Sequence, residues 1–246
     1  MNTGDILTVV RKEWLEFRDQ LLRLKRGGLS AVIVLLMLGI VTPLQMGPLW
    51  ISSPLMLAYW PLLSSGMVST LIADAFAGER ERHTLETLLA TRLSDTSILL
   101  GKILAAILYG LLFTFANIIV GVITLSIAHF GEGLQVPSPT QLGFMFLLVT
   151  LACSTLAGVG VFISLKAATV RQAQQTLGIL MMVLFIGPVL FIQFLDSEGR
   201  QSLAGRLSSL GTAPLVAWVS ALLFTASLVL ILMAMARFKR GKLTLD

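Results

Sequence analysis

Six long apolar segments alternate with short polar segments along the 246 residues of this chain. Each is close to the ~20 residues that a helix needs to cross about 30 Å of hydrocarbon. The segments lie at residues 29–47, 54–76, 98–129, 139–165, 174–195 and 213–236. The pattern predicts an all-α polytopic membrane protein with six transmembrane helices. Pro43, Pro48 and Pro54 crowd the turn between the first two, and Pro61 should kink the second.

The first 28 residues combine an apolar stripe with many charges. The stripe follows spacings of four and three through Ile6, Val10, Trp14, Phe17, Leu21 and Leu24. Such a stripe on a charged helix is typical of a helix lying in the headgroup region. We therefore expect residues 1–28 to form a cytoplasmic amphipathic interfacial helix, followed by a six-span transmembrane domain at residues 29–246. We expect a set of membrane-surface residues suited to an anionic leaflet: Trp14, Phe17, Arg23, Lys25 and Arg26.

A charged island from Glu79 to Lys102 interrupts the apolar pattern. Its leucines recur at spacings of three and four, which places them on one side of a short helix: Leu85, Leu88, Leu89 and Leu93. A helix lying on lipid carries a basic excess, whereas the acidic and basic residues of the island balance. Balanced charge around a leucine face suits a protein groove, so we expect the loop at residues 77–97 to dock on a partner. Residues 94–97 should cap the next helix.

Composition and charge support a membrane protein. The chain is 56% hydrophobic and 13% charged, with a mean hydropathy of +0.88, which is too apolar for a soluble domain. The 18 basic residues form no continuous stripe, so we expect no nucleic-acid binding. With both termini in the cytoplasm, only Arg200 and Arg206 fall outside, as the positive-inside rule requires. We expect an integral protein of a bacterial or archaeal plasma membrane.

The sequence lacks the usual motifs of nucleotide binding and hydrolysis. It contains no Gly-x-x-x-x-Gly-Lys-Ser/Thr loop for ATP phosphates. It also has no Gly-x-Ser-x-Gly elbow and no His-Glu-x-x-His pair. Its single cysteine, Cys153, lies in an apolar segment, and His83 and His129 have no second ligand at a metal-binding spacing. We therefore expect no catalytic residue, cofactor or metal in this chain, which leaves a channel, a carrier or the membrane part of a larger assembly.

A set of residues follows in a fixed order through the island: Glu79, Glu81, Thr84-Leu85-Glu86, Leu88-Leu89, Thr91, Ser94 and Gly101-Lys102. This order resembles the cytoplasmic signature of type 2 ATP-binding-cassette (ABC) transporter permeases. Two positions depart from it, since His83 stands where the family usually has Gly, and Arg92 where it usually has Pro. Because Gly and Pro are poor helix formers, we expect a more continuous helix here.

The resemblance implies a permease subunit of an exporter, not an enzyme by itself. It would form a dimer with a second permease subunit, the same or a homologous chain, and bind separate ABC ATPase subunits that use ATP and Mg. The family's coupling helix, which docks on the ATPase, would correspond to Thr84–Leu93. The docking residues that this implies are Glu79, Glu81, His83, Thr84, Leu85, Glu86, Leu88, Leu89, Arg92 and Leu93.

Two other functions are compatible with the same sequence. A membrane anchor could use the docking helix to recruit a cytoplasmic partner without any transport. An intramembrane enzyme would need polar residues clustered at one depth, and Asn117, His129 and Gln193 form no obvious cluster. The apolar spans favour an amphiphilic or lipid-like cargo over a bare ion, although any lipid-facing helix has that composition.

Overall fold

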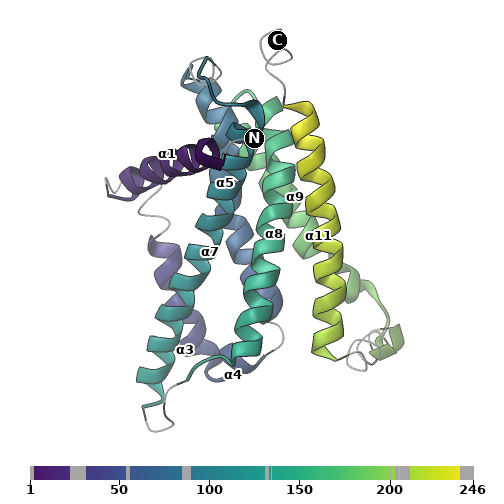
Figure 1. Cartoon of the computed structure of the whole chain (residues 1–246). Coiled ribbons are helices and arrows are strands. Elements are labelled where there is room, and N and C mark those ends of the chain that lie inside the picture. Colours follow the sequence, from purple (N-terminus) through teal and green to yellow (C-terminus); the bar gives the residue numbers. More distant parts are fainter. Residues whose placement is uncertain are drawn as a thin grey trace.

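The chain forms a bundle of long helices with one helix lying across its end (Figure 1). The computed structural model describes residues 3–22, 32–53, 56–84, 90–130, 133, 135–199, 201–202, 205 and 211–238. Within this part of the chain, four helices are long and apolar enough to cross a membrane. They are α5 (Met56–Glu81), α7 (Asp95–Ala128), α8 (Pro139–Lys166) and α11 (Thr212–Arg237). The all-α prediction is confirmed for the described residues, which contain no strand.

Four of the six predicted spans are therefore confirmed as helices that are long and apolar enough to cross a membrane. The first predicted span is a shorter apolar helix, Val32–Met46, interrupted by the π-helical turn η1 (Met37–Val41) before α3 (Thr42–Met46). Pro43 lies in the first turn of α3 and Pro48 caps α4 (Leu49–Ser52), where the missing amide costs no helical hydrogen bond. Pro61 lies inside α5, which continues through it, and Pro54 lies outside the described residues. The fifth predicted span is a continuous helix, α9 (Val170–Phe194), but it is not among the four candidates.

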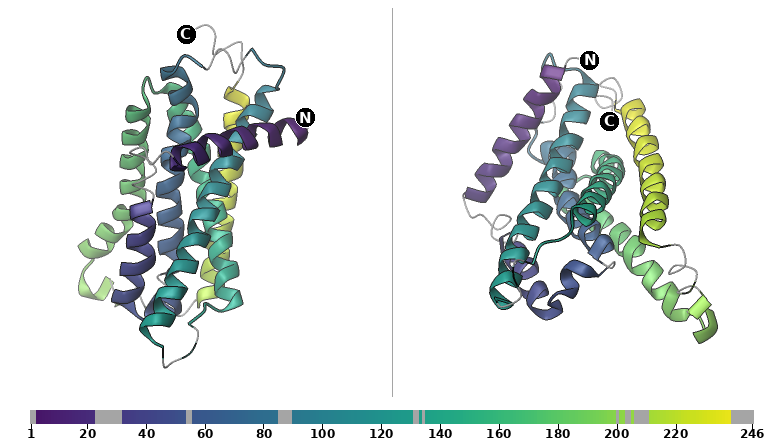
Figure 2. Two further views of the ribbon diagram at one scale, coloured as in Figure 1. Left: turned by 90° about the vertical axis from the view of Figure 1, so that its left-hand side faces the viewer. Right: turned by 60° about the horizontal axis from the view of Figure 1, so that its bottom comes forward.

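Helix α1 (Thr3–Leu22) occupies the expected N-terminal stretch and runs across the long helices. The two further views show it beside the first turns of α7, at the end of the bundle where α11 reaches Arg237 (Figure 2). Helix α7 begins at Asp95 with Ser94 as its N-cap, and the Ser94 hydroxyl accepts a hydrogen bond from the Ser97 amide. The predicted capping of this helix is therefore confirmed.

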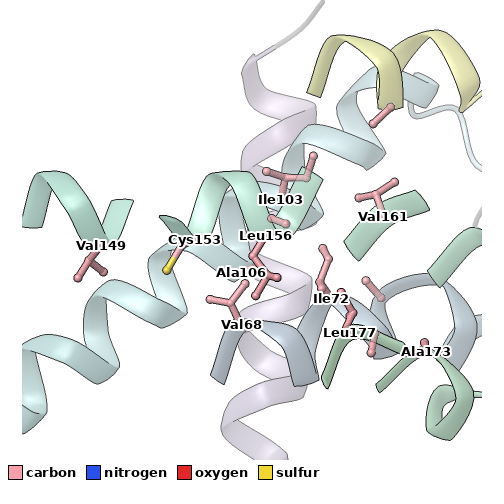
Figure 3. Packing of buried hydrophobic residues seen from close by; sticks show 14 of the residues in the cluster. Val68, Ile72, Ile103, Ala106, Val149, Cys153, Leu156, Val161, Ala173 and Leu177 are labelled. Atoms are coloured by element: carbon pink, nitrogen blue, oxygen red, sulfur yellow. The ribbon is translucent and has the colours of Figure 1, made fainter. Parts of the chain in front are cut away.

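The core lies where α5, α7 and α8 meet (Figure 3). Glycines let these helices approach closely, as is common in membrane bundles. A Cβ at Gly160 would lie 2.3 Å from Cγ2 of Ile72, and one at Gly110 would lie 2.7 Å from Sγ of Cys153. Cys153 is buried in this core. Large side chains at these two glycines would therefore separate α8 from α5 or α7.

Helices α9 and α11 cover the core less completely. Helix α9 packs on α5 and α8 and then leaves the bundle toward its C-terminal end (Figure 2). Large apolar side chains are exposed along both helices, among them Ile179 and Val183 on α9 and Trp218 and Leu222 on α11. Exposed apolar surface of this extent is expected where helices face lipid or another membrane helix.

Candidate functional site

The site begins where α5 ends, at the start of the charged island. The His83 amide donates to the Arg80 carbonyl at 3.0 Å, and the Thr84 amide donates to the Glu79 carbonyl at 2.8 Å. His83 has a φ of +55°, in the left-handed region. These features form a Schellman motif, in which the left-handed residue is usually glycine because glycine has no Cβ to clash. His83, which stands where the signature has glycine, is thus the residue at which α5 ends.

The expectation of a more continuous helix is wrong at both departures from the signature. At His83 the chain adopts the left-handed conformation despite the missing glycine, because the two Schellman hydrogen bonds satisfy the last carbonyls of α5. At Arg92 the backbone bends, and α7 begins only at Asp95. A residue in place of glycine gains only about 1 kcal/mol of helix propensity, so the Schellman hydrogen bonds at His83 override it. A residue in place of proline gains about 3 kcal/mol, and the chain still bends at Arg92.

Most of the leucine face of the predicted docking helix lies outside the described residues. This applies to Leu85, Glu86, Leu88 and Leu89, at residues 85–89. Among its described neighbours, Glu81, His83, Thr84 and Arg92 are exposed. Leu93 is half-buried and packs against the hydrophobic core.

Glu79 lies inside the bundle and not at the surface of the island. Only 4% of the residue is exposed, and its carboxylate lies 3.0 Å from Nζ of Lys102 and 3.0 Å from Nζ of Lys12. Lys102 is 3% exposed and also contacts Glu13 at 2.7 Å. These four residues form a charge cluster that joins α1, α5 and α7, in which Glu79 and Lys102 are buried and Lys12 and Glu13 are partly exposed. Within this chain, Glu79 contacts two lysines, and its predicted role in docking stays a prediction.

The charge cluster depends on a close approach of α1 to α7. A Cβ at Gly101 would lie 2.6 Å from Cβ of Val9, so only glycine fits between the two helices. This approach brings Lys12 and Glu13 over Lys102. The Gly101-Lys102 pair of the signature therefore has a structural explanation, which the sequence alone did not provide: the glycine makes room for α1 and the lysine binds the two glutamates.

The cluster contains two lysines and two glutamates, and the Glu16 carboxylate also lies 3.3 Å from Nζ of Lys12. Burying a charge is costly unless a partner of opposite sign lies close. Each buried member has such a partner, and Nζ of Lys102 also lies 5.5 Å from the ring centroid of Phe76, within the range of a cation–π contact. Burial alone would lower the pKa of Lys12, but the carboxylates of Glu79, Glu13 and Glu16 outweigh burial and raise that pKa above 10.5. Lys12 thus stays charged at neutral pH.

Two further residues at the end of α5 hold the polar loop between α8 and α9. The Arg80 guanidinium donates to the carbonyls of Leu165 at 2.6 Å and Ala167 at 3.1 Å, where α8 ends. The Glu81 carboxylate accepts from the Val170 amide at 3.1 Å, where α9 begins. A cation at a helix C-terminus and an anion at an N-terminus are both favoured by the helix dipole. Sequence reasoning missed Arg80, because its partners are backbone groups that carry no sequence signal.

A buried serine joins α8 directly to the backbone of α5. The Ser164 hydroxyl accepts from the Ala77 amide at 3.0 Å and donates to the Ala73 carbonyl at 2.9 Å. Phe76, on the same turn of α5, packs on Phe238 just beyond α11, with ring centroids 5.2 Å apart. Residues 73–81 of α5 thus contact α1, α7, α8, α9 and the end of α11. We call this segment the α5 hub.

The predicted membrane-surface residues divide into two groups. Trp14 is exposed, whereas Phe17 is half-buried and packs edge-on against Tyr109 of α7, with ring centroids 4.4 Å apart. Phe17 therefore also attaches α1 to the bundle. Arg23, Lys25 and Arg26 lie outside the described residues.

Comparisons with known proteins cover the hub and most of the bundle. Residues 65–243 match the model of a family described as ABC-2 family transporter protein. The protein named ABC transporter permease protein NatB, from Bacillus subtilis (strain 168), is 29% identical over 144 residues. That alignment covers 56% of this chain and 36% of the relative, so the chain matches little more than a third of that protein's length. The family match includes Glu79 and Lys102 but begins after α1.

Proposed function

This chain belongs to the ABC-2 transporter family, and from that membership we propose that it is the permease subunit of an ATP-driven exporter. Members of such a family are transport subunits of the membrane and not themselves the ATPase. In our proposal, two permease subunits, identical or homologous, form the translocation path, and separate ABC ATPase subunits supply the energy of ATP and Mg.

We further propose that six spans cross the membrane, with residues 32–46 and α9 as the first and fifth. Both termini would lie in the cytoplasm, with α1 at the membrane surface. This orientation is supported by α1 and the Arg237 end of α11 lying at one end of the bundle, the end that also carries the charged island. Trp14 would face the headgroups there, joined by the basic residues at 23, 25 and 26.

The observation that carries the proposal is the α5 hub. The ATPase would dock on the exposed residues that follow it, from Glu81 through the leucine face at residues 85–89. A force applied there reaches α5 directly, and the hub passes it to α1 and α7 through the charge cluster and to α8 and α9 through Arg80 and Glu81. A docking loop attached to one flexible helix could not move the bundle as a unit.

The coupling role is tested with Leu88→Asp and with charge reversal at Glu86. We expect either change to release the ATPase from the detergent-purified complex, because a charge on the leucine face opposes burial in a protein groove. Val136→Asp is the control, since Val136 is exposed just before α8 begins, at the end of that helix away from Lys166. Retention of the ATPase with unchanged stimulated hydrolysis in both docking variants would rule out this surface. ATP-dependent efflux from vesicles separates an exporter from a membrane anchor, which would show none.

A further inference from the structure

The end of the bundle opposite α1 carries a segment of short helices, residues 37–53 (Figure 1). It consists of η1, α3 and α4, and we call it the return segment. It packs on α7 and on α5. Its last four residues, 50–53, form one wall of a cavity of about 220 Å³, whose other walls belong mainly to α5, α7 and α8. The return segment therefore covers one side of this cavity.

The return segment begins with the π-helical turn η1, which departs from the regular hydrogen-bond ladder of an α-helix. Gly39 in this turn lies directly on α7, because a Cβ there would lie 2.7 Å from Cγ1 of Val120. The Thr124 hydroxyl of α7 lies 3.2 Å from the Gly39 carbonyl and 2.8 Å from the Val120 carbonyl, and it shares its hydrogen between them. A side chain of α7 therefore holds the return segment at the irregular turn.

Buried polar atoms without a hydrogen-bond partner gather where the return segment meets α7. Among the described residues three lie there: Nε1 of Trp50 on the segment, Oδ1 of Asn117 on α7 and Nδ1 of His129 at the C-cap of α7. A Cβ at Gly39 would lie 3.6 Å from Asn117 Oδ1, and one at Gly47 would lie 3.9 Å from Cε1 of His129. The Trp50 ring fills the space left by Gly121 of α7, where a Cβ would lie 2.2 Å from it. Each of the three atoms exposes less than 1 Å², so no water molecule reaches it.

These three atoms make the contact with α7 less favourable than its apolar packing suggests. Native proteins leave few buried polar groups unsatisfied, and each one loses its hydration without compensation. The described part of the chain contains six such atoms, and half of them lie in this one contact. If the return segment moved away from α7, water could reach all three. The position that the structure shows is therefore opposed by a cost that a displaced position would not have.

We propose that the return segment is a gate, which moves away from α7 about the π-helical turn and opens the cavity of about 220 Å³. The structure shows the closed position. Short irregular turns of this kind are often found at functional sites, and elements that move are held with less stability than the core. The last step of the inference, that the open gate releases cargo at the end of the bundle away from the ATPase, rests on the proposed exporter function.

Two substitutions on α7 test the gate, because they should act in opposite directions. Asn117→Leu keeps the shape of the side chain but removes the unpartnered Oδ1, so it should favour the closed position. Thr124→Val removes the hydroxyl that binds the Gly39 carbonyl, so it should favour the open position. The measurement is amide hydrogen exchange of residues 38–53 in the purified chain in lipid nanodiscs, without ATPase. We expect exchange about fivefold slower in Asn117→Leu and about threefold faster in Thr124→Val.

The buried part of α8 is the internal control, since residues 149–161 belong to the core and should exchange equally in all three proteins. A change in the same direction in both variants, or none in either, would overturn the gate. An equal change in residues 149–161 would also overturn it, because the whole bundle would then be opening.

Efflux separates the gate from the exporter. With the ATPase bound, Asn117→Leu should lower ATP-dependent efflux from vesicles several-fold. If the exchange rates change as expected but even the unsubstituted complex shows no efflux, the gate stands and the exporter function is wrong. If Asn117→Leu slows exchange but leaves efflux unchanged, the return segment is not a gate on the transport path.

Discussion

At the residue scale, the buried Lys102 is the centre of the charge cluster. It contacts Glu13 and Glu79 from two different helices, and Glu79 also contacts Lys12. A buried ion pair contributes little net stability compared with an apolar pair, but removing one partner leaves the other charge buried and uncompensated. The cluster therefore acts as a specific connection between α1, α5 and α7 and not as a general source of stability.

Lys102→Met should destabilise the chain by about 3 kcal/mol, the low end of the cost of breaking a buried pair, because Lys12 still compensates Glu79 in part. The double variant Lys102→Met/Glu79→Gln should recover more than half of the loss. The measurement is chemical or thermal unfolding in detergent. Lys166→Met is the control, since Lys166 is exposed at the end of α8. Equal losses in Lys102→Met and Lys166→Met would show that the cluster contributes nothing.

At the scale of elements, the attachment of α1 depends on Gly101. Its Cα is the point where α1 touches α7, and a Cβ there would lie 2.7 Å from Cγ1 of Val9 and 3.2 Å from the Ile6 carbonyl. The carbonyl cannot rotate away, because it belongs to the α1 backbone. Any side chain at this position must therefore shift α1 as a whole.

Gly101→Ala should cost about 1–3 kcal/mol, as is typical of overpacking, and should loosen α1. Spin labels on Arg11 and Leu108, both exposed, would then report a broader distance distribution between α1 and α7. The control is Gly143→Ala on α8, where nothing lies within 4 Å of the added methyl. That change should stabilise by about 0.5–1 kcal/mol, because alanine is the better helix former. A neutral Gly101→Ala would contradict the described approach of α1 to α7.

The parts of the fold that the sequence predicts are those with a periodic or local cause. The apolar segments predict the long helices because length and hydropathy decide them, and Ser94 predicts the start of α7 because its hydroxyl acts within one turn. The Schellman end at His83 was not predictable from propensity, because it depends on hydrogen bonds from His83 and Thr84 to carbonyls in the last turn of α5. The burial of Glu79 was not predictable either, because its lysine partners are 67 and 23 residues away.

At the scale of the whole molecule, the α5 hub contacts α1, α7, α8, α9 and the end of α11, and all of these contacts lie at one end of the bundle. The charge cluster holds α1 and α7, Ser164 holds α8, and Arg80 and Glu81 hold the turn from α8 to α9. The cavity of about 220 Å³ at the other end of α5 is lined by residues of α4, α5, α7 and α8 and by Thr212 of α11. In the proposed function, a displacement of the hub would reach that end of the bundle along α5 and α8.

Arg80→Gln tests this transmission, and the proposed exporter activity is its readout. The change removes the guanidinium that holds the end of α8, while the docking residues stay in place. We expect the ATPase to remain bound and to hydrolyse ATP, while ATP-dependent efflux from vesicles falls several-fold. Arg18→Gln is the control, because Arg18 is exposed and pairs with Asp19 of the same helix, away from the docking surface. Equal efflux in the two variants would mean that the α8 end moves independently of α5, whereas loss of the ATPase from Arg80→Gln would make Arg80 a docking residue.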